Sequence, residues 1–324
     1  MAYDRGKMME IRKLQYSGKG TYVLSLPKKW LEKHELVKGD KFAVHEMENG
    51  LFITPTFIQE SEKVAVIQVS EFISKEITAR YTYGYNKIII KGPISSHYRV
   101  KITNTLSELM GYDILEENDE KMIITDFLNP SQLNISKTLK REFFLASLMV
   151  RNSLEALQNM DLELARDVIK RDSEVNKLYF LTVRQIRTAL QNTTLAESIG
   201  VNYLESIDLR VVSKCVEEIG DHASRISNSV LELGDCDDQL IKRVTSFGER
   251  AHANSTSAID SFIKVDKRKS AMVLNEKKKF YIEKSKLDTI ILQCNDAIRM
   301  RDILENIKGI GDKAFEIAQL AYKP

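Results

Sequence analysis

The sequence predicts a multidomain α+β protein with three differently built parts. Up to Thr54, short strand-like segments alternate with glycine-containing turns. From Glu62 to Asp126, candidate strands and helices alternate. From Ile135 to Tyr322 there is no proline, and apolar residues recur with helical spacing. This order predicts a strand-rich unit, then a small α+β sandwich, and then a pair of three-helix units.

The N-terminal part is expected to span residues 1–58. Its strand-like segments are Ile11–Leu14, Tyr22–Leu26, Phe42–His45 and Leu51–Ile53. Pro27 precedes a predicted helix over Lys28–Lys33, at a position where a helix tolerates proline. Strands this short cannot bury a core within one chain, so we expect this unit to form a homodimer.

Residues 59–130 are expected to form the α+β sandwich, in which two helices cover one sheet. The predicted strands are Val64–Ile67, Lys87–Lys91, Tyr112–Glu116 and Met122–Thr125. The predicted helices are Glu71–Tyr85 and His97–Met110. The turn-forming segment Asn129–Ser131 marks the boundary with the helical part.

The helical part contains an internal repeat. The segment Ile219–Ala223 recurs as Ile310–Ala314, which indicates a duplicated supersecondary unit with repeats at 131–234 and 235–324. The second copy has Lys308 at the position of Glu217. Phe280 is expected at about the position of Asn176, so we expect only the first copy to keep a metal-binding face.

Two pairs of polar residues in the first repeat form a candidate metal site. Asp172 and Asn176 are four residues apart, as are Glu217 and Asp221, so each pair occupies one face of a helix. If the two helices are antiparallel, four oxygen-bearing side chains converge on one surface, and such clusters suit hard or borderline cations. The alternative is a pair of solvated helix faces.

Composition narrows the function classes. The three cysteines, Cys215, Cys236 and Cys294, lack metal-ligand spacing and are odd in number, which favours a reducing compartment. No apolar run is long enough for a transmembrane segment, and the N-terminus lacks the apolar core of a signal peptide. We therefore expect a cytoplasmic protein. The chain has neither a Ser/His/Asp order nor a Walker loop, so we do not expect an enzyme.

The N-terminal part resembles the SpoVT/AbrB-type domain family. The resemblance rests on the segments Gly18–Trp30 and Leu36–Asp40. It implies a swapped-hairpin β-barrel, built by two chains, that presents basic side chains to double-stranded DNA. The matching residues in this chain are Arg12, Lys13, Lys19, Lys28 and Lys29.

Two features bear on that DNA hypothesis. The first 56 residues hold ten Lys and Arg against seven Asp and Glu, a mild preference for an anionic partner. However, Leu31 and Glu32 stand where some DNA-binding members of the family carry an arginine pair. The alternative is a barrel that serves only to assemble the dimer.

The helical part resembles the PhoU family of phosphate-uptake regulators. The resemblance rests on Ala165–Asn176, Asp208–Arg210 and Glu217–Ala223, with the second copy at Ile310–Ala314. It implies that Asp172, Asn176, Glu217 and Asp221 bind a transition metal, iron or zinc. It also implies modulation of phosphate import together with a transporter and a sensor kinase.

The combination of these two domains in one chain resembles archaeal PhoU-like proteins that join an AbrB-type domain to a PhoU-like domain. It predicts a phosphate-responsive transcriptional regulator, expected to repress phosphate-uptake genes by binding DNA through the N-terminal barrel. The alternative is an adaptor that does not bind DNA and that modulates a phosphate transporter or a sensor kinase.

Overall fold

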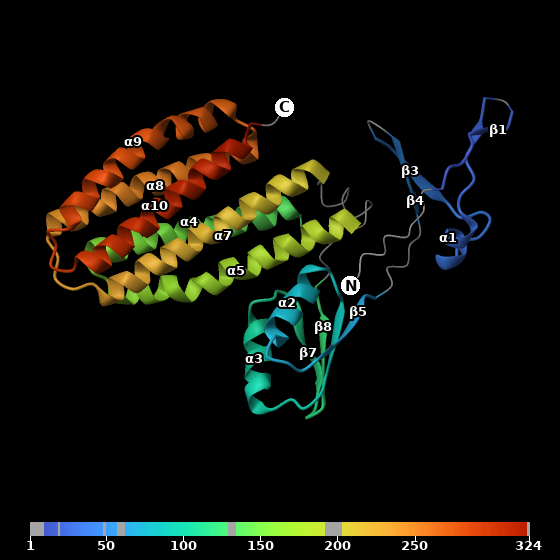
Figure 1. The fold of residues 1–324 in the computed structure, drawn as a ribbon, viewed down its shortest axis with the longest axis horizontal. Coiled ribbons are helices and arrows are strands. Elements are labelled where there is room, and N and C mark those ends of the chain that lie inside the picture. Colours follow the sequence, from blue (N-terminus) through green and yellow to red (C-terminus); the bar gives the residue numbers. More distant parts are fainter. Residues whose placement is uncertain are drawn as a thin grey trace. The chain divides into compact units, whose positions relative to one another are not determined.

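The computed structural model describes residues 10–18, 20–47, 50–56, 62–128, 134–191 and 203–322. The chain divides into two compact units, Met1–Ser61 and Glu62–Pro324. The first unit is small and strand-rich, whereas the second contains an α+β sandwich and a long helical bundle (Figure 1). The protein is thus mostly helical, with small sheets. The finer boundaries proposed within the second unit stay a prediction.

The described residues of the first unit form one short helix and two separate antiparallel ladders. The elements are β1 (Gln15–Tyr16), β2 (Tyr22–Val23), α1 (Lys28–Lys33), β3 (Phe42–Met47) and β4 (Gly50–Pro55). Helix α1 begins directly after Pro27, as predicted. The predicted strand at 11–14 is wrong, because β1 lies directly after it at Gln15–Tyr16, and the predicted strand at 22–26 keeps its strand conformation at Tyr22 and Val23 alone. Both observed strands are short because they pair across the turn that follows Tyr16.

The first unit has almost no core of its own. Among its described residues only Thr54 and Pro55 are buried. Large apolar side chains remain exposed, including Ile11, Leu14, Tyr16, Tyr22, Val37 and Leu51. Such exposure favours burial against another surface, which supports the expectation of a dimer. The swapped-hairpin barrel requires a second chain and stays a prediction.

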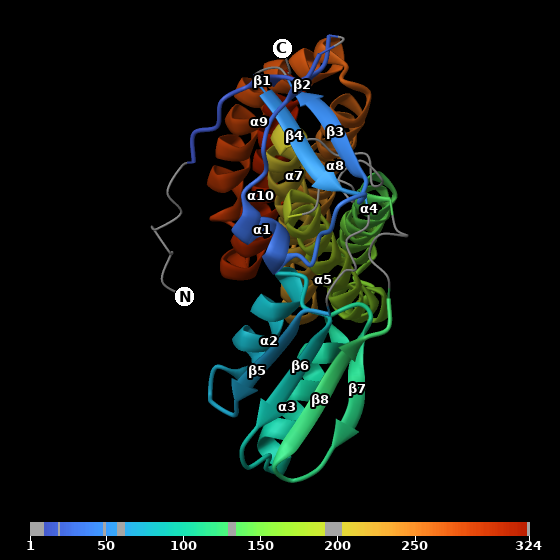
Figure 2. The same cartoon turned by 90° about the vertical axis from the view of Figure 1, so that its right-hand side faces the viewer.

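The sandwich matches its predicted elements closely. They are β5 (Val64–Gln68), α2 (Ile73–Thr82), β6 (Lys87–Lys91), α3 (Ser96–Ser107), β7 (Tyr112–Glu117) and β8 (Lys121–Asp126). The sheet order is β5-β6-β8-β7, with β5 parallel to β6 and the other pairs antiparallel. Helices α2 and α3 lie on one face of this sheet (Figures 1 and 2). Helix α2 is shorter than predicted because Gly84, with φ +77°, turns the chain away.

A fully buried isoleucine-rich core joins the two sandwich helices to the sheet. Ile73 and Ile77 from α2 and Ile102 from α3 pack on the central strands. The strand residues that meet them are Ile88, Ile90, Met122 and Ile124. Buried residues alternate with less buried ones along β6, which is the two-residue period of a strand, whereas Met122, Ile123 and Ile124 of β8 are all buried.

Two groups of three long helices form the bundle, and none of the described helices has the length and apolar character needed to cross a membrane. The first group is α4 (Ile135–Asn159), α5 (Leu162–Gln191) and α7 (Tyr203–Glu232). The second is α8 (Asp238–Lys264), α9 (Lys267–Ile291) and α10 (Ala297–Leu320). Helix α7 packs on α10 and α4 packs on α8 (Figure 1). One continuous apolar core therefore runs through both groups.

The connection between the first and second helices has the same geometry in both groups. The first helix of each ends in a left-handed residue, Met160 (φ 50°) or Val265 (φ 53°). The next residue, Asp161 or Asp266, accepts hydrogen bonds from backbone N–H groups at the start of the following helix. The repeat inferred from sequence thus has matching backbone geometry at these connections.

Arg184 of α5 fixes the sandwich to the bundle. Its side chain is 2% exposed, and its guanidinium contacts the Asp126 carboxylate at 2.6 Å. It also donates to the carbonyls of Tyr81 (2.8 Å) and Tyr85 (3.0 Å). Because a buried arginine must keep all of these partners, the contacts hold α5 against the sandwich at this point.

Candidate functional site

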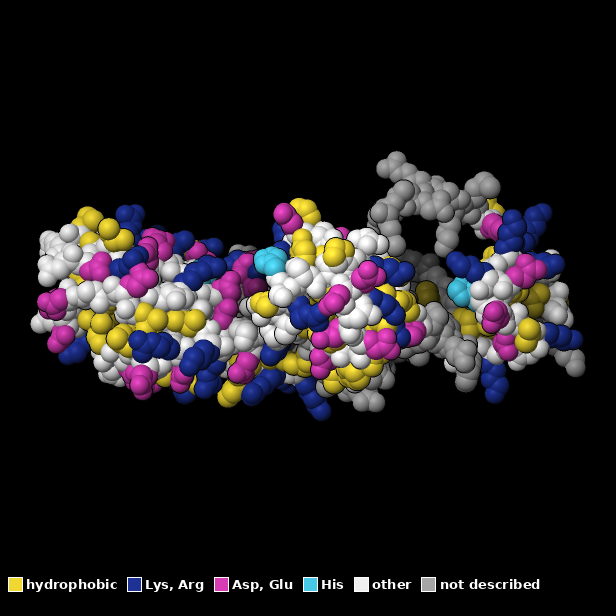
Figure 3. All heavy atoms as spheres, turned by 90° about the horizontal axis from the view of Figure 1, so that it is seen from below, with side chains coloured by type: hydrophobic (Ala, Val, Ile, Leu, Met, Phe, Trp, Pro, Cys, Tyr) yellow, Lys and Arg dark blue, Asp and Glu magenta, His cyan; other side chains and the backbone are white. Residues whose placement is uncertain are grey.

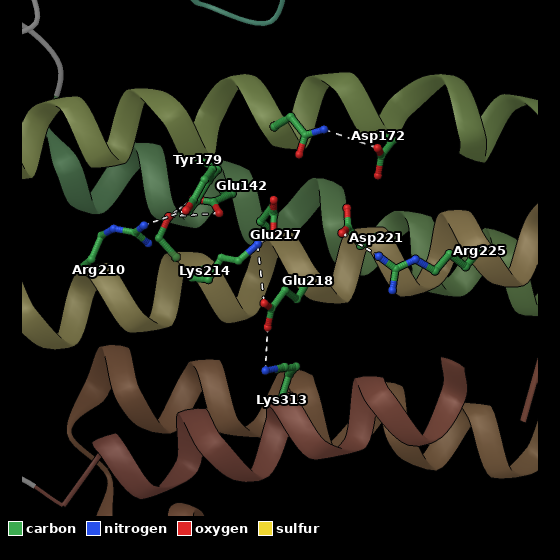
Figure 4. Close-up of polar contacts among 12 residues, drawn as sticks. Glu142, Asp172, Tyr179, Arg210, Lys214, Glu217, Glu218, Asp221, Arg225 and Lys313 are labelled. Atoms are coloured by element: carbon green, nitrogen blue, oxygen red, sulfur yellow. Dashed lines mark hydrogen bonds and ion pairs between the residues drawn. The ribbon is translucent and has the colours of Figure 1, made fainter. Parts of the chain in front are cut away.

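The candidate metal face lies where α5 packs against α7 (Figure 4). Asp172 of α5 is close enough to the Asp221 carboxylate of α7 for electrostatic repulsion between them. Further along α5, the Tyr179 hydroxyl accepts a hydrogen bond from Arg210 of α7. Rising residue numbers on α5 therefore meet falling numbers on α7, so the two helices are antiparallel, as predicted. Between these contacts, Val175 packs on Gly220, where a Cβ atom would lie 3.4 Å from the valine side chain.

Each carboxylate that α7 contributes to this face already has a basic neighbour from α7 itself. The ammonium of Lys214 donates to Glu217 and lies 3.5 Å from Glu218. The guanidinium of Arg225 lies 3.2 Å from Asp221. Figure 4 shows these two pairs following one another along α7. The site predicted from sequence did not include Lys214 or Arg225, although each lies three or four residues from its acid.

On α5, the Asn176 amide donates to Asp172 at 3.4 Å, so this four-residue pair lies on one helix face as predicted. Burial raises the pKa of Asp172, and the Asp221 carboxylate raises it further. Burial also raises the pKa of Glu217, although its hydrogen bond to Lys214 opposes this shift. Both shifts reflect negative charge held in a partly desolvated place, where an additional cation would be favourable.

The oxygen donors of this face fit an oxygen-preferring cation in type, but Lys214 and Arg225 compete for them. Among the residues that the structure describes, no group of three or more His, Cys, Asp or Glu side chains is placed to hold a metal ion. The assignment of Asp172, Asn176, Glu217 and Asp221 as metal ligands therefore stays a prediction.

A buried carboxyl group lies beneath this face. Glu142 of α4 is fully buried and accepts hydrogen bonds from Ser213 (2.9 Å) and Thr182 (3.4 Å). Burial raises the pKa of Glu142 well above its ordinary value. The sequence carried a signal for it, because Glu142 interrupts the apolar face defined by Leu139 and Leu145.

The opposite side of α7 faces α10. Glu218 points away from Glu217 and pairs with Lys313 of α10 at 2.6 Å (Figure 4). His222 bonds Asn306 of α10, with 2.9 Å between Nδ1 and Oδ1. These contacts connect the two repeats, so neither Glu218 nor His222 belongs to the α5–α7 face.

The second repeat carries different chemistry on the equivalent face. Asp312 accepts hydrogen bonds from Lys308 (2.9 Å) and from the Tyr281 hydroxyl (2.5 Å). The expectation that Phe280 takes the position of Asn176 is wrong by one residue. Phe280 packs on Gly311 as Val175 packs on Gly220, so the counterpart of Asn176 is Tyr281.

The candidate DNA-binding residues belong to the first unit. Lys19 lies outside the described residues. Lys13 and Lys29 are exposed, Arg12 pairs with Glu10, and Lys28 lies 3.6 Å from Glu32. At the right-hand end of Figure 3, basic side chains project from several sides of this unit and alternate with acidic ones. A single continuous basic surface is not visible in this view, and DNA binding stays a prediction.

Two three-helix groups, with an acidic face between the antiparallel helices α5 and α7, make up the bundle, and part of it is similar to the PhoU domain. Residues 139–230 match the family model of the PhoU domain. The crystal structure of PhoU from Pseudomonas aeruginosa has a similar fold, with a TM-score of 0.51 at 18% identity, covering 59% of this chain and 95% of that one.

Two curated relatives match a similar stretch of sequence, and both are named phosphate-specific transport system accessory protein PhoU homolog. The protein from Burkholderia sp. is 27% identical over 95 residues, which is 29% of this chain and 38% of the relative. The protein from Xylella fastidiosa is 33% identical over 89 residues, or 28% of this chain and 35% of the relative. The matched stretch therefore spans well under half of each relative.

Proposed function

We propose that this protein is a regulatory accessory protein of phosphate transport, and that it acts as a cytoplasmic, non-enzymatic adaptor. The match of residues 139–230 to the PhoU domain carries the proposal, because the matching relatives are named as accessory proteins of phosphate-specific transport. In this role the helical bundle docks on a phosphate transporter or on a sensor protein that controls it.

The α5–α7 face is the proposed regulatory site of this adaptor. Asp172, Asn176, Glu217 and Asp221 would bind iron or zinc through their side-chain oxygens. Their position on facing helices and the raised pKa values of Asp172 and Glu217 support this assignment. A bound cation would release Lys214 and Arg225 from their carboxylates. The local charge pattern that a partner meets would then change.

A second candidate function is transcriptional repression through the first unit. Its exposed apolar side chains favour a homodimer with an AbrB-type barrel, and Lys13 and Lys29 are accessible to phosphate groups. The PhoU match covers only the helical part, so it supports the adaptor and carries no information about DNA. The adaptor is therefore the primary proposal.

One experiment separates these functions. Phosphate uptake and the transcript level of the uptake operon are measured together in cells with and without the gene. The adaptor proposal expects deletion to change uptake at a given transcript level, whereas repression expects the transcript to rise first. Unchanged uptake at every phosphate concentration would contradict both.

DNA binding is tested directly by an electrophoretic shift with the promoter of a phosphate-uptake operon at two salt concentrations. A specific, salt-dependent shift that Lys19→Glu with Lys28→Glu weakens would favour the repressor. The homodimer is tested by light scattering of the full chain and of a chain beginning at Gln59. Equal oligomeric states would remove the first unit as the dimer interface.

A further inference from the structure

Two of the three cysteines meet in space although 58 residues separate them. Cys236 follows α7 in the connection to α8, and Cys294 lies in the turn between α9 and α10. Their sulfur atoms are 2.6 Å apart. Both side chains are partly exposed, so a small molecule in solution can reach them. The sequence spacing gave no sign of this pair, because only the packing of the second repeat brings the two segments together.

Contacts on both sides keep the two segments aligned. The N–H of Gly234 donates to the Asp296 carboxylate at 3.0 Å, and Glu232 forms an ion pair with Arg299. These residues flank Cys236 and Cys294, so the sulfur atoms do not depend on each other for their approach. An S–S bond is about 2.05 Å long, so only a small movement separates the present arrangement from a bond.

We propose that Cys236 and Cys294 form a redox-active dithiol, which a low-molecular-weight disulfide such as oxidised glutathione converts into an intramolecular disulfide. Each cysteine thiol loses one hydrogen, and the two sulfur atoms form one S–S bond. The oxidant's S–S bond breaks and takes up the two electrons and two protons, giving two thiols. A dithiol such as dithiothreitol reverses the reaction.

The exchange proceeds in two steps. One of the two thiols loses its proton to solvent and attacks the disulfide of the oxidant, which forms a mixed disulfide and releases one thiol. The second protein thiol then loses its proton to solvent and attacks the protein sulfur of the mixed disulfide, which releases the second thiol of the oxidant. The 2.6 Å between the two sulfur atoms places the second thiol for this step.

The bridge would close a loop that contains all of α8 and α9. Closing a long loop restricts the unfolded chain, so oxidation should stabilise the second repeat and fix its α8–α9 pair against α7 and α10. The remaining cysteine, Cys215, is 2% exposed and buried in the bundle core, so it should stay a thiol under the same conditions.

The full chain is incubated with oxidised glutathione or with dithiothreitol, and free thiols, intact mass and thermal stability are measured. Oxidation should reduce the free thiols from three to one, remove two hydrogens from the mass and raise Tm by roughly 5–15 °C. Cys215→Ser is the matched control and should keep the mass loss and the Tm increase. Cys236→Ser and Cys294→Ser should each lose both.

Several outcomes would overturn the proposal. These are three free thiols after oxidation, stable glutathione adducts on single cysteines, or a chain-to-chain disulfide on a non-reducing gel. Loss of the two hydrogens in Cys236→Ser, or failure of Cys215→Ser to lose them, would assign the bridge to a different pair. Because none of these measurements uses phosphate transport, the result is independent of the proposed function.

Discussion

The first and second repeats of the bundle have matching helices but differ at buried positions that this match makes equivalent. In the first repeat, Glu142 is buried and is hydrogen-bonded by Thr182 and Ser213. Counted from the matching helix ends and glycines, the equivalent positions in the second repeat hold buried apolar residues: Phe247, Leu287 and Leu304. Phe247 stacks on Phe280 with 4.3 Å between ring centroids. One repeat thus has a polar group in its core where the other has stacked rings.

The α5–α7 face of the first repeat and the equivalent face of the second repeat also carry different side chains. Asp172, Asn176, Glu217 and Asp221 of the first repeat correspond to Lys277, Tyr281, Lys308 and Asp312 of the second. Buried polar groups and crowded carboxylates cost stability, whereas packed aromatic rings contribute to it. We infer that the second repeat mainly stabilises the bundle. The first repeat keeps a less stable arrangement, which agrees with the proposal that its α5–α7 face is a metal site.

The largest expected effect concerns metal binding. Glu217→Ala with Asp221→Ala should abolish binding of iron or zinc, a loss of more than about 100-fold in affinity, because both oxygen donors of α7 are removed. Asp312→Ala, the matched change in the second repeat, should leave metal binding almost untouched, because Lys308 stands there at the position of Glu217 and removes the second carboxylate of the pair. Elemental analysis of wild-type protein should find roughly one or two metal ions per chain.

Two results would contradict this prediction. Metal retained by the double variant would place the site elsewhere in the chain. Wild-type protein without metal would mean that Lys214 and Arg225 are the only cations of this face.

The matched glycines should respond differently to alanine. At Gly311 a Cβ atom would lie 2.5 Å from the Phe280 ring, which Phe247 holds in place, so Gly311→Ala should destabilise the protein by about 1–3 kcal/mol. At Gly220 the nearest atom would be 3.4 Å away. Gly220→Ala should therefore be neutral or stabilise by up to about 1 kcal/mol through helix propensity. Chemical denaturation measures both, and equal effects would refute the proposed difference in packing.

Glu142 should make stability depend on pH. Since burial raises its pKa, the folded state binds a proton more tightly than the unfolded state does. This contribution is complete below the ordinary pKa of 4.5 and is lost as pH rises toward the raised value. Glu142→Gln should remove the loss and be more stable than wild type at pH 8 by on the order of 1 kcal/mol. Urea unfolding at pH 5 and pH 8 tests this, and parallel pH profiles would contradict it.

The smallest expected effect concerns the contact between the repeats. Glu218 and Lys313 are each partly exposed, so their ion pair should contribute only about 0.2–1 kcal/mol. A double-mutant cycle with Glu218→Gln and Lys313→Met measures the coupling, and adding salt should weaken it. A coupling well above this range would mean that the repeats depend on this pair for their packing.

The sequence by itself determined the features that depend on neighbouring residues. Pro27 placed the start of α1, the alternation of strand-like and helix-like segments placed the sandwich elements within a few residues, and four-residue spacing placed Asp172 with Asn176. The recurrence of Ile219–Ala223 at Ile310–Ala314 indicated the repeat. Each of these signals arises from backbone conformation and side-chain period, which act over a few residues.

Only the tertiary structure decided which distant groups meet. It paired Cys236 with Cys294 and Arg184 with Asp126, and it buried Glu142 beneath the acidic face. The chain pattern showed a carboxylate in an apolar stripe but not the two hydroxyl groups that satisfy it. It also placed Phe280 one position away from its true equivalent, because helix register is set by which side chain fills the space over a glycine. Such contacts depend on how whole helices pack, and local spacing carries no information about that packing.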